Sequence, residues 1–283
     1  MPKVSFITAS YNYAEYIGQT IEFVINQTYT DWEMLVIDDG SKDNSIEVIN
    51  EYTKKDSRVK LLTHPNNENR GLVETLKFGI NQAQGDYIVF LESDDYIRED
   101  YLEKKTAYFE KYNDAGFIYN DIQTFGAKQT LKRKMYFWLV NHHWKTHNYP
   151  HNISEMLYLR NYIPTFSCVM LKKELLSDLS WESPDKACID LWLWAQISQR
   201  TSFYYIQEKL TYWRLHKDSY LNTSRVNNNI LNFYEQLYNN LPAMKHLSTK
   251  LGFIEKQIAI SVKYKKCVFN NLKHIIKNRE VAN

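Results

Sequence analysis

The chain has 283 residues and a net charge of only +2, enough length to bury a full core in one domain plus an extension. Its three cysteines, Cys168, Cys188 and Cys267, are odd in number and far apart, so they predict no disulfide framework and favour a reducing compartment. No apolar run approaches the roughly 20 residues that span a bilayer, and the first residues lead into a strand without a charged and apolar leader. We therefore expect a cytoplasmic protein with no membrane span.

Strands and helices are predicted to alternate along the N-terminal part of the chain. The expected strands cover residues 3–10, 33–38, 59–63 and 87–91, and the expected helices cover residues 14–27, a stretch beginning near Asn44 or Ser45, and residues 71–84. This alternation predicts an α/β fold with a mostly parallel, doubly wound sheet flanked by helices.

The fourth expected strand ends in acids. The apolar residues 87–91 are typical of a strand covered on both faces, and Glu92, Asp94 and Asp95 follow at its carboxyl end, where open α/β sheets bind ligands. Clustered carboxylates repel one another and resist desolvation unless a cation neutralises them. Two interpretations are open at this point: a metal site, or a solvated turn that caps the helix expected after Asp100.

Two further strand ends carry polar residues. Tyr11-Asn12 follows the first strand and Asp38-Asp39 closes the second. In a parallel sheet these ends lie along the same edge as Glu92 to Asp95. We expect one crevice there, suited to a nucleotide and a cation.

Four motifs occur in order in this region. They are Val4 to Asn12, Val36 to Asp43, Asn69-Arg70-Gly71, and Gly79-Ile80 followed by Ala83 to Tyr87. In this order and spacing the sequence resembles the family 2 glycosyltransferases, nucleotide-sugar enzymes of the GT-A fold, continuously over residues 3–121. The resemblance implies a Rossmann-like GT-A domain over residues 1–222, with a nucleotide-binding half (1–121) and an acceptor half (122–222), and a helical C-terminal extension over residues 223–283.

The resemblance also implies how the nucleotide is held. Asp39 matches the acid that recognises uracil, and Tyr11 matches a stacking or edge contact on the base. Arg70 or Lys77 would contact the base or a phosphate. Ala9-Ser10 stands where the family commonly has a Pro-Thr pair, and the contact at Ala9 would be partly through the backbone. A UDP-sugar donor is expected, with a dTDP-sugar left open.

The acidic motif departs from the family in one position. The family usually begins it with Asp, whereas this chain has Glu92, so a ribose or metal contact at Glu92 is left open. Asp94 and Asp95 remain in place. The resemblance assigns Asp94 to the nucleotide and the metal, and Asp95 to the metal.

Two later segments carry the remaining chemistry. Cys188 to Trp194 resembles the motif in which an Asp serves as catalytic base, here Asp190, with Ile189 where Glu is common. Asp190 is alternatively an N-cap for a helix from Leu191 to about Arg200. Leu210 to Ser219 resembles the segment that closes the active site, in which His216 is a metal ligand and Arg214 reaches the diphosphate.

The implied cofactor is a divalent metal, Mn²⁺ or Mg²⁺, which as a Lewis acid stabilises a departing diphosphate. A single base with no nucleophilic partner predicts one displacement and inversion of the anomeric centre.

The acceptor side of the crevice is expected between Ile122 and Pro164. Aromatic and basic residues gather there: Lys128, Lys132, Arg133, Lys134, Tyr136, Phe137, Trp138 and Trp144. They favour a glycan or lipid-linked acceptor, although ordinary core and rim residues have the same composition. Residues 165–171 are predicted to form a strand that returns to the sheet.

Helical spacing takes over from about Thr223. Residues 245–283 are rich in Lys and Arg along an amphipathic pattern. This pattern favours either peripheral contact with the cytoplasmic face of a membrane or packing on the catalytic domain or a second subunit. No nucleic-acid partner is expected.

The sequence therefore predicts an inverting glycosyltransferase, a hexosyl- or N-acetylhexosaminyltransferase of surface polysaccharide synthesis. One alternative is a nucleotidyltransferase, which would be expected to carry a Gly-rich basic loop where this chain has Tyr11-Asn12-Tyr13. The other is a non-catalytic sugar-binding or scaffold protein of the same fold, which Glu92 and Ile189 favour.

Overall fold

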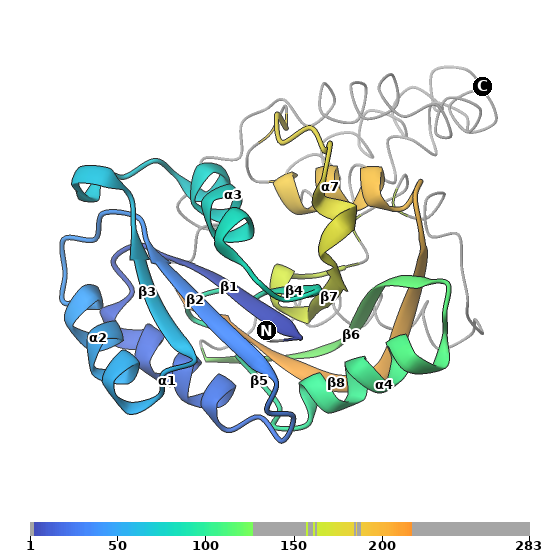
Figure 1. The fold of residues 1–283 in the computed structure, drawn as a ribbon, viewed down its shortest axis with the longest axis horizontal. Helices are drawn as coiled ribbons and strands as arrows, with labels where there is room; N and C mark the ends of the chain where they lie inside the picture. Colours follow the sequence, from blue (N-terminus) through green and yellow to red (C-terminus); the bar gives the residue numbers. More distant parts are fainter. Residues whose placement is uncertain are drawn as a thin grey trace, which may run out of the picture.

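The computed structural model describes residues 3–126, 157, 161, 163–183, 185 and 188–216. Its centre is an eight-stranded sheet with the strand order β3-β2-β1-β4-β7-β6-β8-β5. Figure 1 shows the sheet crossing the molecule, with helices on both of its faces. The α/β architecture expected from the alternating pattern is confirmed.

The first half of the sheet follows the predicted elements closely. In chain order it comprises β1 (Val4–Ser10), α1 (Ala14–Ile25), β2 (Trp32–Asp38), α2 (Ser45–Lys55), β3 (Val59–Thr63), η1 (Pro65–Asn67), α3 (Leu72–Gln82) and β4 (Tyr87–Phe90). β1 pairs in parallel with both β2 and β4, and β2 pairs in parallel with β3. The carboxyl ends of these strands therefore meet at one edge.

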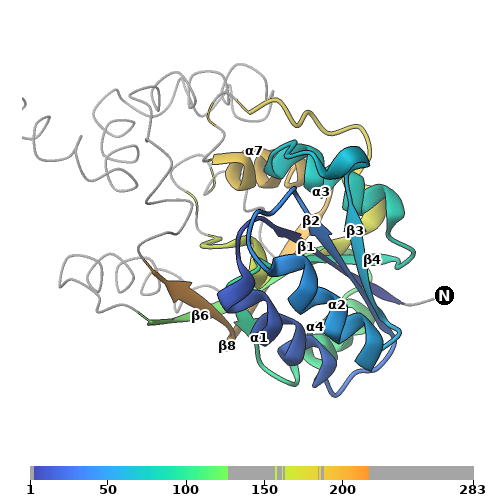
Figure 2. The same cartoon turned by 90° about the vertical axis from the view of Figure 1, so that its left-hand side faces the viewer.

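The buried strands divide their side chains between two cores. On β4, Ile88 and Phe90 pack with α3 and α7 (Ile189–Ile197), while Val89 packs with α1, α2 and α4 (Tyr101–Lys111). Successive residues of a strand point to opposite faces, so a strand covered on both sides is apolar throughout. Figure 2 shows α3 and α7 on one side of the sheet and α1, α2 and α4 on the other.

Gly79 allows α3 to lie close to the sheet. A Cβ atom at this position would meet Ile7 Cγ2 at 2.7 Å and Ile37 Cδ1 at 2.8 Å. These distances are shorter than van der Waals contact, so a side chain here would push the helix away from β1 and β2.

The second half of the sheet is mixed. It contains β5 (Tyr96–Ile97), β6 (Ala115–Gly126), η2 (Phe166–Cys168), β7 (Val169–Lys172), η3 (Lys173–Leu176) and β8 (Ser202–Leu215). β7 runs antiparallel to both β4 and β6, whereas β6 and β8 are parallel. The strand predicted over 165–171 is thus shorter than expected, because Thr165 accepts a hydrogen bond from the Ser167 N–H and closes a 3₁₀ turn before it.

β8 extends further than the sequence indicated. The segment expected to close the active site is strand as far as Leu215, paired with β6 up to Gly126. Aromatic and β-branched residues such as Phe203, Tyr204 and Ile206 favour this extended conformation and are buried in the sheet.

Several predictions fall outside the described residues. These are the aromatic and basic positions from Lys128 to Trp144, the boundary between residues 222 and 223, the helical extension 223–283 and Cys267. They stay predictions. Among the described residues, none of the helices combines the length and apolar character needed to cross a membrane.

Candidate functional site

A cavity of about 580 Å³ opens at the carboxyl ends of β1, β2 and β4. Residues from all three predicted strand ends line it, including Tyr11 and Asn12, Asp39, and Glu92 to Asp94. The single crevice expected from the sequence is therefore confirmed. Its floor is apolar, formed by side chains such as Ile7, Phe90 and Phe166.

The Tyr11-Asn12 turn is locked to the turn after β2. Asn12 has a φ of +58°, a left-handed conformation that Asn tolerates better than most residues. Its side-chain oxygen accepts a hydrogen bond from Lys42 N–H at 2.7 Å, and its own N–H donates to Ser41 Oγ at 2.9 Å. This arrangement leaves Tyr11 43% exposed at the cavity wall, beside Ala9.

Asp39 joins the end of β2 to the loop that begins α3. Its Oδ1 accepts a hydrogen bond from Arg70 N–H at 2.7 Å and its Oδ2 accepts one from Gly71 N–H at 2.9 Å. The carboxylate is buried and faces the cavity. Asp39 therefore shapes the wall of the cavity in addition to any contact that it makes with a ligand.

His64 is a site residue that the sequence did not reveal. Its Nε2 lies 3.0 Å from Thr75 Oγ1 and 3.5 Å from Asp39 Oδ1, and its side chain is buried. Thr75 in turn donates to the Gly71 carbonyl at 3.0 Å. His64 therefore helps to hold Asp39 in place. The only sequence signal for this role is its position between β3 and the Asn69-Arg70-Gly71 motif.

Arg70 and Lys77, predicted to contact the nucleotide, have side chains directed elsewhere. The Arg70 guanidinium lies 3.4 Å from the Glu68 carboxylate, and the Lys77 amine lies 2.9 Å from that of Glu74. All four side chains are largely exposed, and neither basic residue is among the described residues lining the cavity.

The three acids after β4 point in different directions. Asp94 lines the cavity, and its Oδ2 lies 2.7 Å from His216 Nε2. Glu92 also lines the cavity and accepts a hydrogen bond from the Thr165 hydroxyl. Asp95 is fully buried and accepts hydrogen bonds from Arg214 N–H at 2.9 Å and from Ser167 Oγ at 2.7 Å.

Burial makes these carboxylates difficult to ionise, and for Glu92 and Asp95 the neighbouring acids add to the effect. Burial and the adjacent Asp94 charge raise the pKa of Glu92 to about 7. Burial, with the charges of Glu92 and Asp94, raises the pKa of Asp95 well above its ordinary range. Burial also raises the pKa of Asp94, although the hydrogen bond with His216 acts in the opposite direction. A cation at Asp94 would offset this repulsion.

The described side chains supply part of a binding site for a hard divalent ion. Among the described residues, no three His, Cys, Asp or Glu side chains are arranged to hold a metal on their own. Asp94 and His216 supply one oxygen and one imidazole nitrogen beside the cavity. Mg²⁺ commonly uses one or two protein carboxylates and takes its other ligands from water and substrate phosphates, so this pair is compatible with an ion that arrives with a diphosphate.

The Arg214 side chain is committed to protein partners. Its Nε donates to the Asp94 carbonyl oxygen at 2.8 Å, and a terminal nitrogen donates to the Gln19 side-chain oxygen. The guanidinium also lies over the Phe125 ring, 4.5 Å from its centroid. The contact between Arg214 and a diphosphate stays a prediction.

Asp190 stands in the first turn of α7. The helix begins at Ile189 and its N-cap is Cys188, so the alternative N-cap role of Asp190 is not the one observed. Asp190 Oδ2 accepts a hydrogen bond from Asn161 Nδ2, and Asn161 Oδ1 accepts one from Ile163 N–H at 3.1 Å. The Asp190 charge contributes to the raised pKa of Glu92, which places it on the side of the acids that faces α7.

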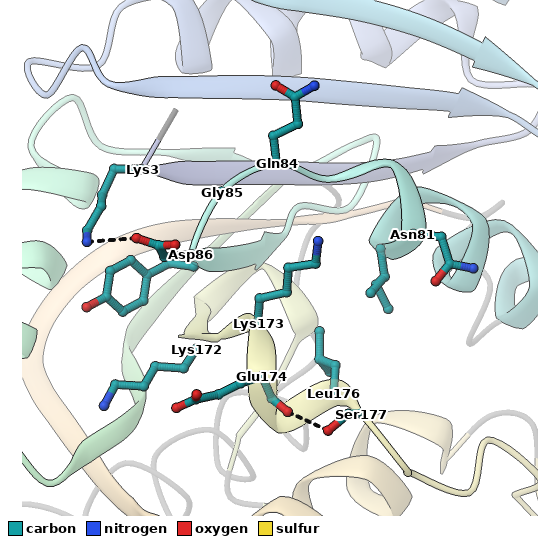
Figure 3. Close-up of a pocket in the computed structure, with 12 residues that line it drawn as sticks. Lys3, Asn81, Gln84, Gly85, Asp86, Lys172, Lys173, Glu174, Leu176 and Ser177 are labelled. Atoms are coloured by element: carbon teal, nitrogen blue, oxygen red, sulfur yellow. Dashed lines mark hydrogen bonds and ion pairs between the residues drawn. The ribbon is translucent and has the colours of Figure 1, made fainter. Parts of the chain in front are cut away.

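A second cavity, of about 770 Å³, lies at the amino ends of β1 and β4. Figure 3 shows three lysines around it, with Lys3 joined to Asp86 across 2.9 Å. Lys173 Nζ donates to the Ala83 carbonyl at 2.5 Å. This cavity is at the edge of the sheet opposite the acids, so the candidate site is the cavity beside Asp94.

Solved structures share this fold. The 1–349 fragment of Staphylococcus aureus TarS in complex with UDP-GlcNAc aligns with a TM-score of 0.64 at 17% identity, covering 95% of this chain and 73% of that fragment. Glucosyl-3-phosphoglycerate synthase from Mycobacterium tuberculosis, solved with Mn²⁺ and UDP, aligns with a TM-score of 0.56 at 14% identity, covering 86% of this chain and 80% of its own. At such identities the likeness is one of fold, and it confirms the expected GT-A architecture.

Relatives in sequence match a shorter region. An uncharacterized glycosyltransferase of Haemophilus influenzae is 48% identical over 105 residues, which are 37% of this chain and 41% of that protein. A Bacillus subtilis glycosyltransferase named for teichuronic acid biosynthesis is 38% identical over 104 residues, 37% of this chain and 40% of its own length. The chain thus matches about two fifths of each of these relatives.

The family model described as glycosyl transferase family 2 matches residues 5–180, which is more than half of the 283-residue chain. The match includes the strand ends that form the cavity, the acids after β4 and the turn that carries Thr165 and Ser167. It confirms the resemblance expected from the motifs. This chain belongs to glycosyl transferase family 2.

Proposed function

We propose that this chain is a glycosyltransferase that moves a sugar from a nucleoside-diphosphate sugar, a UDP-sugar in the first instance, to a hydroxyl of a glycan or lipid-linked acceptor. The observation that carries the proposal is the Asp94–His216 pair, 2.7 Å apart, at a cavity formed by three strand ends. Family membership and the UDP-GlcNAc complex of TarS support the donor class. The teichuronic acid relative supports surface polysaccharide as the product class.

The cavity provides groups for the nucleotide half of the donor. Tyr11 offers an exposed ring for the base, and Asp39 presents a buried carboxylate between the base region and the loop at Gly71. Ser10 Oγ lines the same cavity and is buried without a hydrogen-bond partner among the described residues. A buried hydroxyl of this kind is stabilised when a ligand or ordered water supplies the missing partner.

Asp94 and His216 would hold the divalent ion. When bound, Mn²⁺ or Mg²⁺ stabilises the negative charge of the departing diphosphate as a Lewis acid. The Mn²⁺ and UDP complex of the mycobacterial neighbour supports this cofactor. The chain's own contribution is to keep the two side chains in contact and to bury Asp94 beside Asp95, so that a cation is favoured there.

Asp190 would accept the proton of the acceptor hydroxyl as that hydroxyl attacks the anomeric carbon. Its carboxylate is fixed by Asn161 and lies in the first turn of α7. A single displacement assisted by one base inverts the anomeric configuration. Proton NMR of the first-formed product tests this step, and a product of retained configuration would contradict it.

The test of the whole proposal is UDP release measured with a panel of UDP-sugars and Mn²⁺, for the wild type and for Asp190→Asn. We expect donor-dependent UDP release that EDTA abolishes and that Asp190→Asn reduces strongly. Undiminished turnover in EDTA would contradict the metal. Donor binding without any turnover in the wild type, across the panel and with glycan acceptors, would favour the non-catalytic alternative.

A further inference from the structure

We propose that Asp95 and Arg214 are positioning residues that set His216 against Asp94, and that neither of them contacts the metal or the diphosphate. The inference rests on the proposed function, because it concerns Asp94 and His216, the two proposed metal ligands. It differs from the roles that the sequence resemblance implied for these two residues, and the contacts of the described residues carry it.

Both oxygens of the Asp95 carboxylate accept hydrogen bonds from protein donors. Its Oδ1 accepts from the Arg214 main-chain N–H at 2.9 Å, and its Oδ2 accepts from Ser167 Oγ at 2.7 Å and, more weakly, from Thr165 Oγ1 at 3.4 Å. The residue is 0% exposed and is not among the described residues lining the cavity. The two oxygens thus connect the turn from Glu92 to Asp95 with two other segments, the end of β8 and the turn at η2.

The Arg214 side chain adds one connection from β8 to the turn that carries the acids and one to α1. Its side chain donates to the carbonyl oxygen of Asp94 and to the side chain of Gln19 on α1. The Tyr16 and Phe125 rings lie 4.9 Å and 4.5 Å from the guanidinium carbon, which fixes the plane of the group. The main chain of Arg214 is held by Asp95 and its side chain by Asp94 and Gln19.

These connections determine where His216 lies. His216 is two residues beyond Arg214, just after β8 ends at Leu215. The imidazole then meets the Asp94 carboxylate at 2.7 Å, with the Tyr16 ring 5.0 Å away between centroids. Two side chains that bind one metal ion have to be held to within roughly half an ångström of the required geometry, and residues that contact the ligands supply that precision.

The turn that contacts Asp95 is itself fixed from the opposite side by α4. Tyr101 Oη donates to the carbonyl oxygens of Ser167 and Val169, at 3.1 Å each. The buried amine of Lys105 donates to the Cys168 carbonyl at 2.7 Å. A chain of contacts therefore runs from α4 through Ser167 and Asp95 to the end of β8, and it explains why a Lys is buried there.

The experiment is Mn²⁺ titration in the presence of UDP, by isothermal calorimetry and by loss of the free Mn²⁺ EPR signal. Asp94→Asn removes a proposed ligand, so we expect loss of far more than 100-fold in Mn²⁺ affinity. Asp95→Asn keeps the shape of the side chain and an acceptor for Arg214 N–H, so we expect a loss of about tenfold, the lower end for residues behind a ligand. Equal losses for the two variants would overturn the inference.

Arg214→Lys provides an independent test of the inference if Asp95→Asn folds poorly. It keeps the main-chain N–H but removes the planar group that reaches Asp94 and Gln19. Because positioning acts on the metal pair, we expect Mn²⁺ affinity to fall about tenfold while UDP affinity without metal is unchanged. A direct diphosphate contact would instead weaken UDP binding without metal, and that result would contradict the inference.

Arg58→Lys is the matched control. Arg58 also pairs with a carboxylate, that of Asp56 at 2.6 Å, and lies over an aromatic ring, Trp32 at 3.8 Å, but it is remote from the acids. We expect no change in Mn²⁺ or UDP affinity. If Asp94→Asn also retains Mn²⁺ binding, the proposed function loses its metal site, a failure distinct from equal losses at Asp94 and Asp95.

Discussion

The two halves of the sheet are built in different ways. In β1 to β4 a helix connects each strand to the next one in the chain, and all pairings among them are parallel. In the other half the strands lie in the order β7-β6-β8-β5, and three pairings are antiparallel: β4 with β7, β6 with β7, and β5 with β8. Most residues that line the cavity belong to the first half, whereas Asp190 and His216, the proposed base and metal ligand, belong to the second.

This difference predicts a division of kinetic roles. Variants of the cavity wall in the first half are expected to change donor binding, and variants of Asp190 and Asn161 in the second half are expected to change turnover at a given donor occupancy.

Asp190→Asn should have the largest effect on turnover. A positioned base contributes about 10²–10⁴-fold to rate, so we expect kcat to fall by that factor while UDP affinity stays at the wild-type value. UDP release and calorimetry measure the two quantities. Asp178→Asn is the control, because Asp178 is an exposed residue with a φ of +54°, which Asn accepts. A loss of UDP affinity equal to the loss of kcat would break the division.

Asp39→Asn should show the opposite pattern. The amide nitrogen replaces one of the two oxygens that accept N–H groups from Arg70 and Gly71, so two donors face each other in the cavity wall. Hydrogen bonds to charged groups contribute about 1.5–3 kcal/mol, so UDP affinity should fall roughly 10- to 100-fold. The KM for the donor should rise with kcat at saturation little changed. A lowered kcat at unchanged KM would contradict a donor-binding role.

The accuracy of the sequence predictions follows the same division. β1, β2, β3 and α3 lie within a few residues of the predicted ranges, because apolar runs, Gly40-Ser41 and Gly71 mark their ends locally. Gly40 has a φ of +78°, which a turn residue without Cβ adopts readily. The cavity at the strand ends was predictable for the same reason.

The side-chain partners of Asp95 and Arg214 were not predictable from the sequence. Both residues carry a charge that suits a ligand, but their partners come from segments more than seventy residues away, such as Ser167 and Gln19. A residue's own neighbours in sequence cannot indicate such partners. His64 and Asn161 were missed for the converse reason, since their partners make them part of the site.

Asn161→Ala tests whether the second half orients its base. Removing the amide that donates to Asp190 should lower kcat by about tenfold, the effect of some 1.4 kcal/mol, with UDP affinity unchanged. If Asn161 acts only through Asp190, the double variant Asn161→Ala/Asp190→Asn should be no slower than Asp190→Asn alone. Independent, additive losses in the double variant would show that Asn161 acts in another way.

Lys105→Met should have the smallest effect, one on stability. Burial lowers the pKa of Lys105 well below its ordinary value, so the unfolded chain binds a proton that the folded chain binds more weakly. Stability contributed by this group is therefore present at high pH and is lost as the pH falls from the ordinary lysine value toward the lowered one. Urea unfolding of the wild type between pH 7 and pH 9 should show stability rising with pH. Lys105→Met lacks the titrating amine, so its curve should rise less steeply over the same interval. Parallel curves for the two proteins would mean that the amine remains charged in the fold, held by the carbonyl oxygens of Cys168 and Ile118 that now accept its hydrogen bonds.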